Sequence, residues 1–269
     1  MKKISAFLLA LCTVLCLTAC NNPDQPDNTD ETTVPTTKTV YLHSSVTQEY
    51  GSSVTRTEYQ FDEKDILTDI VIYSGDEETD RYRVQCDENG NATRWSNEET
   101  TMECRYDDRG RTLGTTVSMN GAVVSSTTYI WEGDLRTGVT SSGEGFESRH
   151  TFTYDEAGHL IRQDIYTNGE LTGYSICTND ENGRIVQAIN YLSDGSEGSA
   201  IRYTYSDSTE TRTTTLPDGT VTQKIVLAYD ETGNLSTSTT YDGEGSIVSK
   251  ETHVWRAVEV PIDCPRAPI

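Results

Sequence analysis

The chain has 269 residues with 43 acidic and 21 basic side chains, which gives a formal net charge of −22. This balance argues against a nucleic-acid partner and against a protein that lies flat on an anionic membrane, because like charges repel. Hydrophobic residues make up 34% of the chain, too few for a thick two-layer core along its whole length. Sustained helical periodicity is absent from the sequence, which therefore predicts an all-β protein.

Residues 1–19 have the composition of an export signal. A basic start, Met1-Lys-Lys3, precedes an apolar run from Ile4 to Leu17, and Leu17-Thr-Ala-Cys20 follows. The run is too short to span a bilayer. The segment resembles a bacterial lipoprotein signal peptide and its lipobox. That resemblance implies cleavage before Cys20, lipidation of the Cys20 thiol and an extracytoplasmic protein held at the membrane by its lipid. An ordinary secretory signal cut nearby is the alternative.

Residues 20–39 are expected to form an extended tether that begins at the lipidated cysteine. Three prolines interrupt a stretch rich in Asp, Asn and Thr, and Val34 is its one aliphatic residue. Such a segment cannot bury enough apolar surface to order its backbone. The folded domain is expected over residues 40–256, and a Pro-rich tail over 257–269.

The expected domain contains an internal repeat. Phe152-Thr-Tyr-Asp-Glu-Ala-Gly-His-Leu160 returns as Leu227-Ala-Tyr-Asp-Glu-Thr-Gly-Asn-Leu235, and weaker copies begin at Tyr59, Val84 and Cys104. The acidic position of the copies advances from Asp62 to Asp230 in seven steps of 24 residues on average. A fixed period of this length indicates a repeat architecture, here with about eight copies.

Each copy predicts a β-hairpin. The Tyr-x-Tyr pair places two aromatic rings on one face of a strand, and Asp-Glu-x-Gly supplies the chain reversal. A second turn signal follows half a period later, as at Asn168-Gly169 and Asp218-Gly219. Two turns per copy mean two strands, so we expect an elongated, twisted antiparallel β-meander that is largely single-layered or partly coiled. A small β-propeller of about four blades is the alternative.

The unit Tyr-x-Tyr-Asp-x-x-Gly-x-Leu resembles the YD repeat of Rhs proteins and teneurins over roughly residues 59–255. In that family the repeats build a spiral β-sheet that can enclose a cargo or present a surface. The chain departs from the family pattern, since the arginine that usually precedes Tyr-x-Tyr is matched at Arg202 and only approximately at Arg149. Several copies also lack the Tyr or the Gly. The resemblance therefore implies a fold and not a toxin-delivery function.

The sequence offers no recognisable catalytic or metal-binding motif, and we expect no enzyme activity, no cofactor and no metal centre. The turns at Asp87 and Asp180 offer oxygen ligands for Ca²⁺ but lack the bidentate Glu of an EF-hand, and their role in turns explains them. Cys86 and Cys104 occupy aromatic positions of consecutive copies. Their Cα atoms should lie about 10 Å apart, beyond the ~7 Å limit of a disulfide, which favours buried small hydrophobic residues. Cys264 is expected to be free or to pair through the tail.

The aromatic stripe is the candidate binding surface. Its rings bring large contact area at low entropic cost, although the same rings can simply form the cross-strand ladder of a thin sheet. We therefore expect a cell-surface binding or scaffold module for a protein or glycan ligand, of undetermined oligomeric state. The alternative is a glycan-active enzyme that uses turn carboxylates, which requires two of them about 5–10 Å apart beside a cleft. The predicted contact residues are Tyr129, Trp131, Phe152, Tyr154, Tyr203 and Tyr205.

Overall fold

The computed structural model describes residues 37–261. The predicted signal peptide, Cys20 and residues 262–269 of the predicted tail lie outside this range. No helix long and apolar enough to cross a membrane occurs among residues 37–261. Within these residues the regular structure consists of strands. They are β1 (Thr37–Tyr50), β2 (Ser53–Phe61), β3 (Leu67–Ser74), β4 (Glu77–Cys86), β5 (Ala92–Ser96), β6 (Thr100–Tyr106), β7 (Thr112–Met119), β8 (Ala122–Glu132), β9 (Leu135–Gly143), β10 (Phe146–Tyr154), β11 (Leu160–Thr167), β12 (Glu170–Asn179), β13 (Ile185–Leu192), β14 (Glu197–Tyr205), β15 (Thr209–Thr215), β16 (Val221–Tyr229), β17 (Leu235–Asp242) and β18 (Ile247–Pro261).

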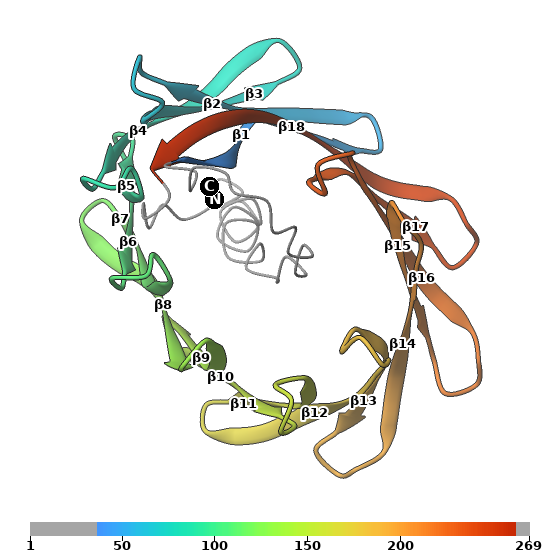
Figure 1. The fold of residues 1–269 in the computed structure, drawn as a ribbon. Coiled ribbons are helices and arrows are strands. Elements are labelled where there is room, and N and C mark those ends of the chain that lie inside the picture. The colour runs from blue at the N-terminus through green and yellow to red at the C-terminus, as the bar shows by residue number, and fades with distance from the viewer. Residues whose placement is uncertain (1–36, 262–269) are drawn as a thin grey trace, which may run out of the picture.

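The strands form one closed antiparallel barrel. Each strand pairs with its neighbours along the chain, and the 18-stranded sheet closes where β18 pairs with β1 (Figure 1). The predicted open meander and the predicted propeller are therefore both wrong. An open sheet would leave the backbone N–H and C=O groups along the outer edges of β1 and β18 unpaired. The accumulated twist of the wall brings these two edges together, and they satisfy each other.

Closure also extends the folded region at both ends beyond the predicted residues 40–256. β1 begins at Thr37, inside the predicted tether, and β18 runs to Pro261, inside the predicted tail. Thr37 is the cross-strand partner of Pro261, so the terminal residues of the barrel are paired with each other. Residues 37–39 and 257–261 are ordered as strand because each has a partner strand more than 200 residues away.

The two terminal strands build a second layer over part of the wall. Residues 37–43 of β1 pair with β18, whereas pairing of β1 with β2 begins only at Ser45. This two-stranded ribbon lies inside the ring, next to β2, β3 and β4 (Figure 1). Its apolar side chains, including Leu42 and Val258, are buried together with Ile70, Trp95 and Met102 of the wall. The hydrophobic core therefore lies on the inner face of β2–β7.

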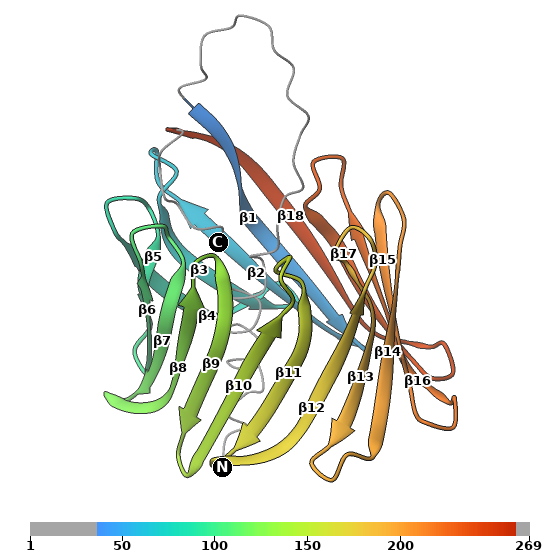
Figure 2. The same ribbon diagram turned by 60° about the horizontal axis from the view of Figure 1, so that its bottom comes forward.

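The remaining wall, β8–β17, is a single layer (Figure 2). None of the buried core residues found in the described part of the chain comes from these ten strands. Ser175 and Ala188 are their only buried side chains. The large, fully buried side chains thus belong to one part of the barrel, and the apolar side chains of the rest, Ala188 apart, are partly or fully exposed.

The repeated Asp forms the predicted turn. In the best copy, Asp155 Oδ1 accepts hydrogen bonds from the backbone N–H groups of Ala157 and His159, at 2.9 and 2.8 Å. Gly158 has a φ of +86°, which a residue with a side chain adopts only at a cost. Because neighbouring strands are antiparallel, these turns all lie at one end of the barrel, and the Asn-Gly and Asp-Gly turns lie at the other.

Candidate binding wall on the inner face

The six predicted contact residues lie on one face of the sheet. Cross-strand pairs connect the core residue Val117 to Ser125 of β8, and Tyr129 of β8 through Val139 to His150 of β10. Side chains that are paired across strands, or two apart along one strand, share a face. The same cross-strand pairing, followed from β10 through β11, β12 and β13 to β14, places Tyr203 and Tyr205 on this face as well. All six residues therefore point to the inside of the barrel, where each is half-buried.

In most repeats the second residue of the Tyr-x-Tyr pair, which is Tyr, Trp or Asn, connects its repeat to the preceding one by a hydrogen bond. Tyr154 Oη donates a hydrogen bond of 2.7 Å to the carbonyl oxygen of Arg136, at the start of β9. That carbonyl lies where the chain leaves a turn and the strand register shifts. Equivalent bonds run from Tyr106 to Ala92, from Trp131 to Thr112, from Asn179 to Leu160, from Tyr205 to Ile185 and from Trp255 to Leu235. We call these bonds the repeat clasps, and Trp131, Tyr154 and Tyr205 serve the fold through them.

In the three predicted pairs, the first aromatic residue packs against arginine. The guanidinium of Arg136 lies between the rings of Tyr129 and Phe152, 5.9 and 5.2 Å from their centroids. Arg212 lies 5.7 Å from the ring centroid of Tyr203 and forms an ion pair of 2.5 Å with Glu210. A guanidinium over a ring face is attracted by the ring quadrupole. These three rings take no part in the clasps, which leaves them as the candidate ligand contacts.

Polar groups adjoin Phe152 on the same wall. The two ring nitrogens of His150 contact Gln163 at 2.7 Å and Ser148 Oγ at 3.1 Å. Burial and the positive charge of Arg136 lower the pKa of His150, so the ring is neutral near pH 7. Because the Gln163 amide donates to His150 Nδ1, the neutral ring carries its proton on Nε2 and donates it to Ser148 Oγ. His150 therefore cannot take the Ser148 proton, and an amide stands where a hydrolytic triad has a carboxylate. The arrangement offers hydrogen bonds to a ligand and lacks the charge that stabilises an imidazolium.

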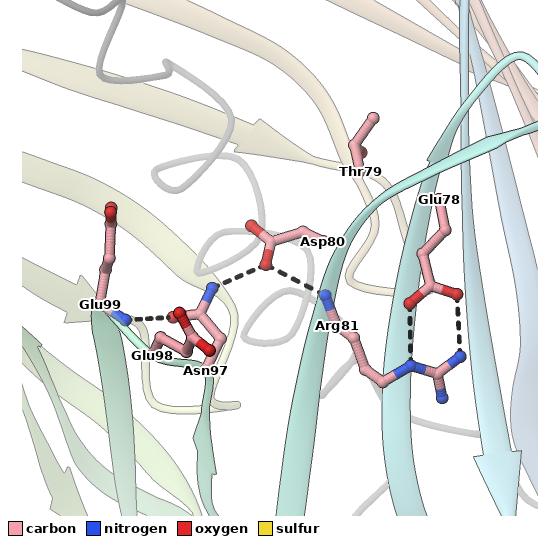
Figure 3. A pocket seen from close by; sticks show the side chains of 7 residues that line it. All are labelled: Glu78, Thr79, Asp80, Arg81, Asn97, Glu98 and Glu99. Carbon is pink, nitrogen blue, oxygen red and sulfur yellow. Dashed lines mark hydrogen bonds and ion pairs between the residues drawn. The ribbon is translucent and has the colours of Figure 1, made fainter.

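A separate hollow of about 450 Å³ lies where β4 begins, next to the turn between β5 and β6 (Figure 3). Four of its lining residues are acidic, and two of them, Glu78 and Asp80, already have partners. Asp80 accepts a hydrogen bond of 2.6 Å from Asn97 Nδ2, and both oxygens of Glu78 accept bonds from Arg81 (Figure 3). The hydrogen bond from Arg81 lowers the pKa of Glu78. None of the six predicted residues lines this hollow.

The acidic turns and the cysteines have structural roles. Asp87 and Asp180 each accept two backbone N–H groups of their own turn, as expected for turn residues. Residues 37–261 contain no group of three His, Cys, Asp or Glu side chains placed to hold a metal ion. Cys104 is buried within the core and Cys86 packs against it. Cys177 faces the interior from β12, and burial raises the pKa of its thiol.

The arginines that pack on these rings are residues of the candidate site that the sequence reasoning missed. Arg111 and Arg184 each follow the turn Gly, pair with the turn Asp, and cover the ring of Trp131 or Tyr205. The recurring Gly-Arg at the end of the turn is the sequence signal that could have identified them. The clasps could not be found in this way, because they join residues about 20 positions apart through the pairing of strands.

No protein-family model matches the chain, and no curated protein sequence matches it. Among solved structures, TcdB2-TccC3 without its hypervariable C-terminal region is 14% identical with a TM-score of 0.36; the match covers 76% of this chain, which spans 15% of that one. A porin-like protein from Bacteroides uniformis is 12% identical with a TM-score of 0.31, covering 80% of this chain and 96% of that chain. A porin-like protein from Bacteroides vulgatus is 8% identical with a TM-score of 0.38, covering 81% and 99%. Likenesses at this level carry no inference about function.

Proposed function

We propose that the protein is an extracytoplasmic lipoprotein, anchored through Cys20, that acts as a binding module and takes its ligand on the inner wall of β8–β17. The observation that supports this most strongly is the uneven cover of the inner face. Over β2–β7 the ribbon of β1 and β18 buries the side chains, whereas over β8–β17 the same face stays half-exposed. Barrels of 16–18 strands are too wide for their own side chains to fill.

The chemistry of the wall favours a glycan as the ligand. Tyr129, Phe152 and Tyr203 offer ring faces, while Ser148 and Gln163 offer hydroxyl and amide groups beside them. Flat rings with a few polar groups around them suit sugar rings, which have apolar faces and hydroxyl edges. Many of the acidic residues lie in the turns, such as Asp155, Asp180 and Asp230, and Glu210 on the wall is paired with Arg212.

The alternative of a glycan-active enzyme requires turn carboxylates that are available for acid and base chemistry. Asp155, Asp180 and Asp230 instead accept backbone and side-chain hydrogen bonds within their turns, and these bonds lower their pKa values. A catalytic acid needs the opposite shift, towards neutral pH. Binding is therefore the better proposal for this geometry.

The test is a glycan-array screen of the full-length protein beside a Tyr129→Ala, Phe152→Ala double variant. Neither residue is in a clasp, so the variant should stay folded and lose binding. A Tyr166→Ala variant, which alters a ring on the outer face, is the matched control. Unchanged binding by the folded double variant would move the site off the wall, and turnover of a bound glycan would refute the binding proposal.

The anchor has its own test. Replacing Cys20 by Ala should release the protein from the membrane fraction, since lipidation needs the thiol. A Cys20→Ala protein that remains in that fraction would contradict the proposed anchor without affecting the binding proposal.

A further inference from the structure

The outer face of β11–β14 carries a row of stacked charged and aromatic side chains. Tyr174 and Tyr191 are cross-strand partners, and their rings stack with centroids 4.9 Å apart and planes inclined by 15°. The guanidinium of Arg162 covers the other face of Tyr174, 4.2 Å from its centroid. Asp164 holds that guanidinium by an ion pair of 2.6 Å. Across the sheet the row therefore reads carboxylate, guanidinium, ring, ring.

Beyond Tyr191 the row continues onto β14, where a carboxylate follows the ring and no cation of the described chain lies between them. The cross-strand partner of Tyr191 on β14 is Glu197, an exposed residue with no ion pair to any residue of the described barrel wall. Cross-strand partners have Cβ atoms about 5 Å apart, so the carboxylate can reach the face of the ring that Tyr174 leaves uncovered. The next residue, Gly198, adds no side chain to this region. The far half of the row thus reads ring, then carboxylate.

Other outward-facing tyrosines have a cation from the chain itself. Arg56 covers Tyr73, Arg149 covers Tyr166 and Lys224 approaches Tyr241. Tyr191, by contrast, is in none of the ten cation–ring contacts found among residues 37–261. Tyr174 has both a guanidinium and a carboxylate beside it, whereas Tyr191 has only a carboxylate.

We propose that Tyr191 and Glu197 form a binding site for the guanidinium of an arginine on a basic partner segment. Charge complementarity supports a basic partner, because the chain has a net charge of −22. Arginine fits better than lysine: nine of the ten cation–ring contacts in the described structure use Arg. A planar guanidinium can stack on a ring while its edge forms two bonds to a carboxylate, which an ammonium cannot do.

This site is on the opposite face of the sheet from the inner wall and does not depend on it. A partner bound here would contact the outside of the barrel, whereas the glycan proposed above would contact the inside. Loss of one activity should therefore leave the other intact.

The test uses the full-length protein and a fluorescent peptide, Gly-Arg-Gly-Arg-Gly, with affinity measured by fluorescence anisotropy at low salt. Tyr191→Ala and Glu197→Gln should each weaken binding about fivefold, the effect expected of one exposed cation–ring or ion-pair contact. The same peptide with citrulline in place of arginine should not bind. Tyr241→Ala, a matched tyrosine that has its own lysine, should bind like the wild type.

Three results would overturn the proposal: citrulline peptide binding as well as arginine peptide, Glu197→Gln binding like the wild type, or Tyr241→Ala losing as much affinity as Tyr191→Ala. Glu197 is exposed, so its substitution keeps the test valid even if Tyr191→Ala unfolds. The Tyr129→Ala, Phe152→Ala variant should bind the arginine peptide normally, which separates failure here from failure of the inner-wall proposal.

Discussion

The two parts of the barrel wall are stabilised in different ways. In β1–β7 and β18 a second layer covers the inner face, and Leu67, Ile70 and Met102 are almost fully buried. In β8–β17 the inner face has no such cover, and the wall depends on clasps, arginine–aromatic stacks and hydroxyl pairs such as Thr127 with Ser141. The comparison shows that the repeats form a single-layer wall without further elements. A hydrophobic core forms only where β1 and β18 fold over that wall.

The sequences of the strands follow this division. β3 contains Ile70, Val71 and Ile72 in succession, which suits a strand covered on both faces. β15 reads Thr-Glu-Thr-Arg-Thr-Thr-Thr, and every residue of it is half-buried. Threonine suits a pleated surface that stays partly exposed. The largest fully buried apolar side chains thus belong to the ribbon and the strands beneath it, whereas Ile130, Phe146 and Leu192 of the single-layer wall are exposed.

The largest expected difference between the two parts is in the cost of removing an apolar side chain. Leu67 is 1% exposed, and Leu67→Ala should lower the free energy of unfolding by about 3 kcal/mol, through lost transfer energy and the cavity left behind. Ile225→Ala on the single-layer wall should cost about 1 kcal/mol, because that side chain is already half-exposed. Urea unfolding followed by tryptophan fluorescence measures both. Equal losses would mean that the two parts are equally well packed.

A smaller effect is expected from breaking one clasp. Tyr154→Phe removes only the hydroxyl that donates to the Arg136 carbonyl, and it should lower the free energy of unfolding by about 1 kcal/mol. Tyr241→Phe is the control, since the Tyr241 hydroxyl forms no hydrogen bond with the described residues. If both variants unfold at the same urea concentration, the clasps do not stabilise the single-layer wall.

The smallest effect concerns pH and the strand that closes the barrel. His253, whose Nε2 lies 3.7 Å from the carboxylate, and a hydrogen bond from Gln48 lower the pKa of Glu251 on β18, whose side chain is 30% exposed. Because the folded pKa lies below the unfolded one, Glu251 stabilises the barrel above the ordinary glutamate pKa of about 4.3, and the contribution disappears as the pH falls through the folded value. Glu251→Gln should therefore cost under ~1 kcal/mol at pH 7, after allowance for solvent screening.

Thermal unfolding from pH 7 down to pH 2 checks this. The midpoints of wild type and Glu251→Gln should differ at neutral pH and converge in acid. A gap that stays constant over the whole range would mean that the ionised carboxylate does not contribute.

The sequence alone determined the features that depend on neighbouring residues. The turn at Asp155 to Gly158 follows from the ability of Asp to bond backbone groups ahead of it and of Gly to adopt positive φ. The shared face of Phe152 and Tyr154 follows from strand periodicity. The common face of the six aromatic residues could therefore be predicted from the sequence. Their role in binding stays a proposal. The export signal and Cys20 are features of the sequence outside the described residues and stay predictions.

Only the tertiary structure decided that the sheet closes, which of its faces lies inside and where the core is. Closure depends on twist added up over 18 strands and on pairs such as His43 with Trp255, separated by more than 200 residues. The sequence could not distinguish clasp aromatics such as Tyr154 from ring faces such as Phe152 either. That distinction depends on which carbonyl of an earlier strand lies within reach, and strand pairing determines it rather than the residue type.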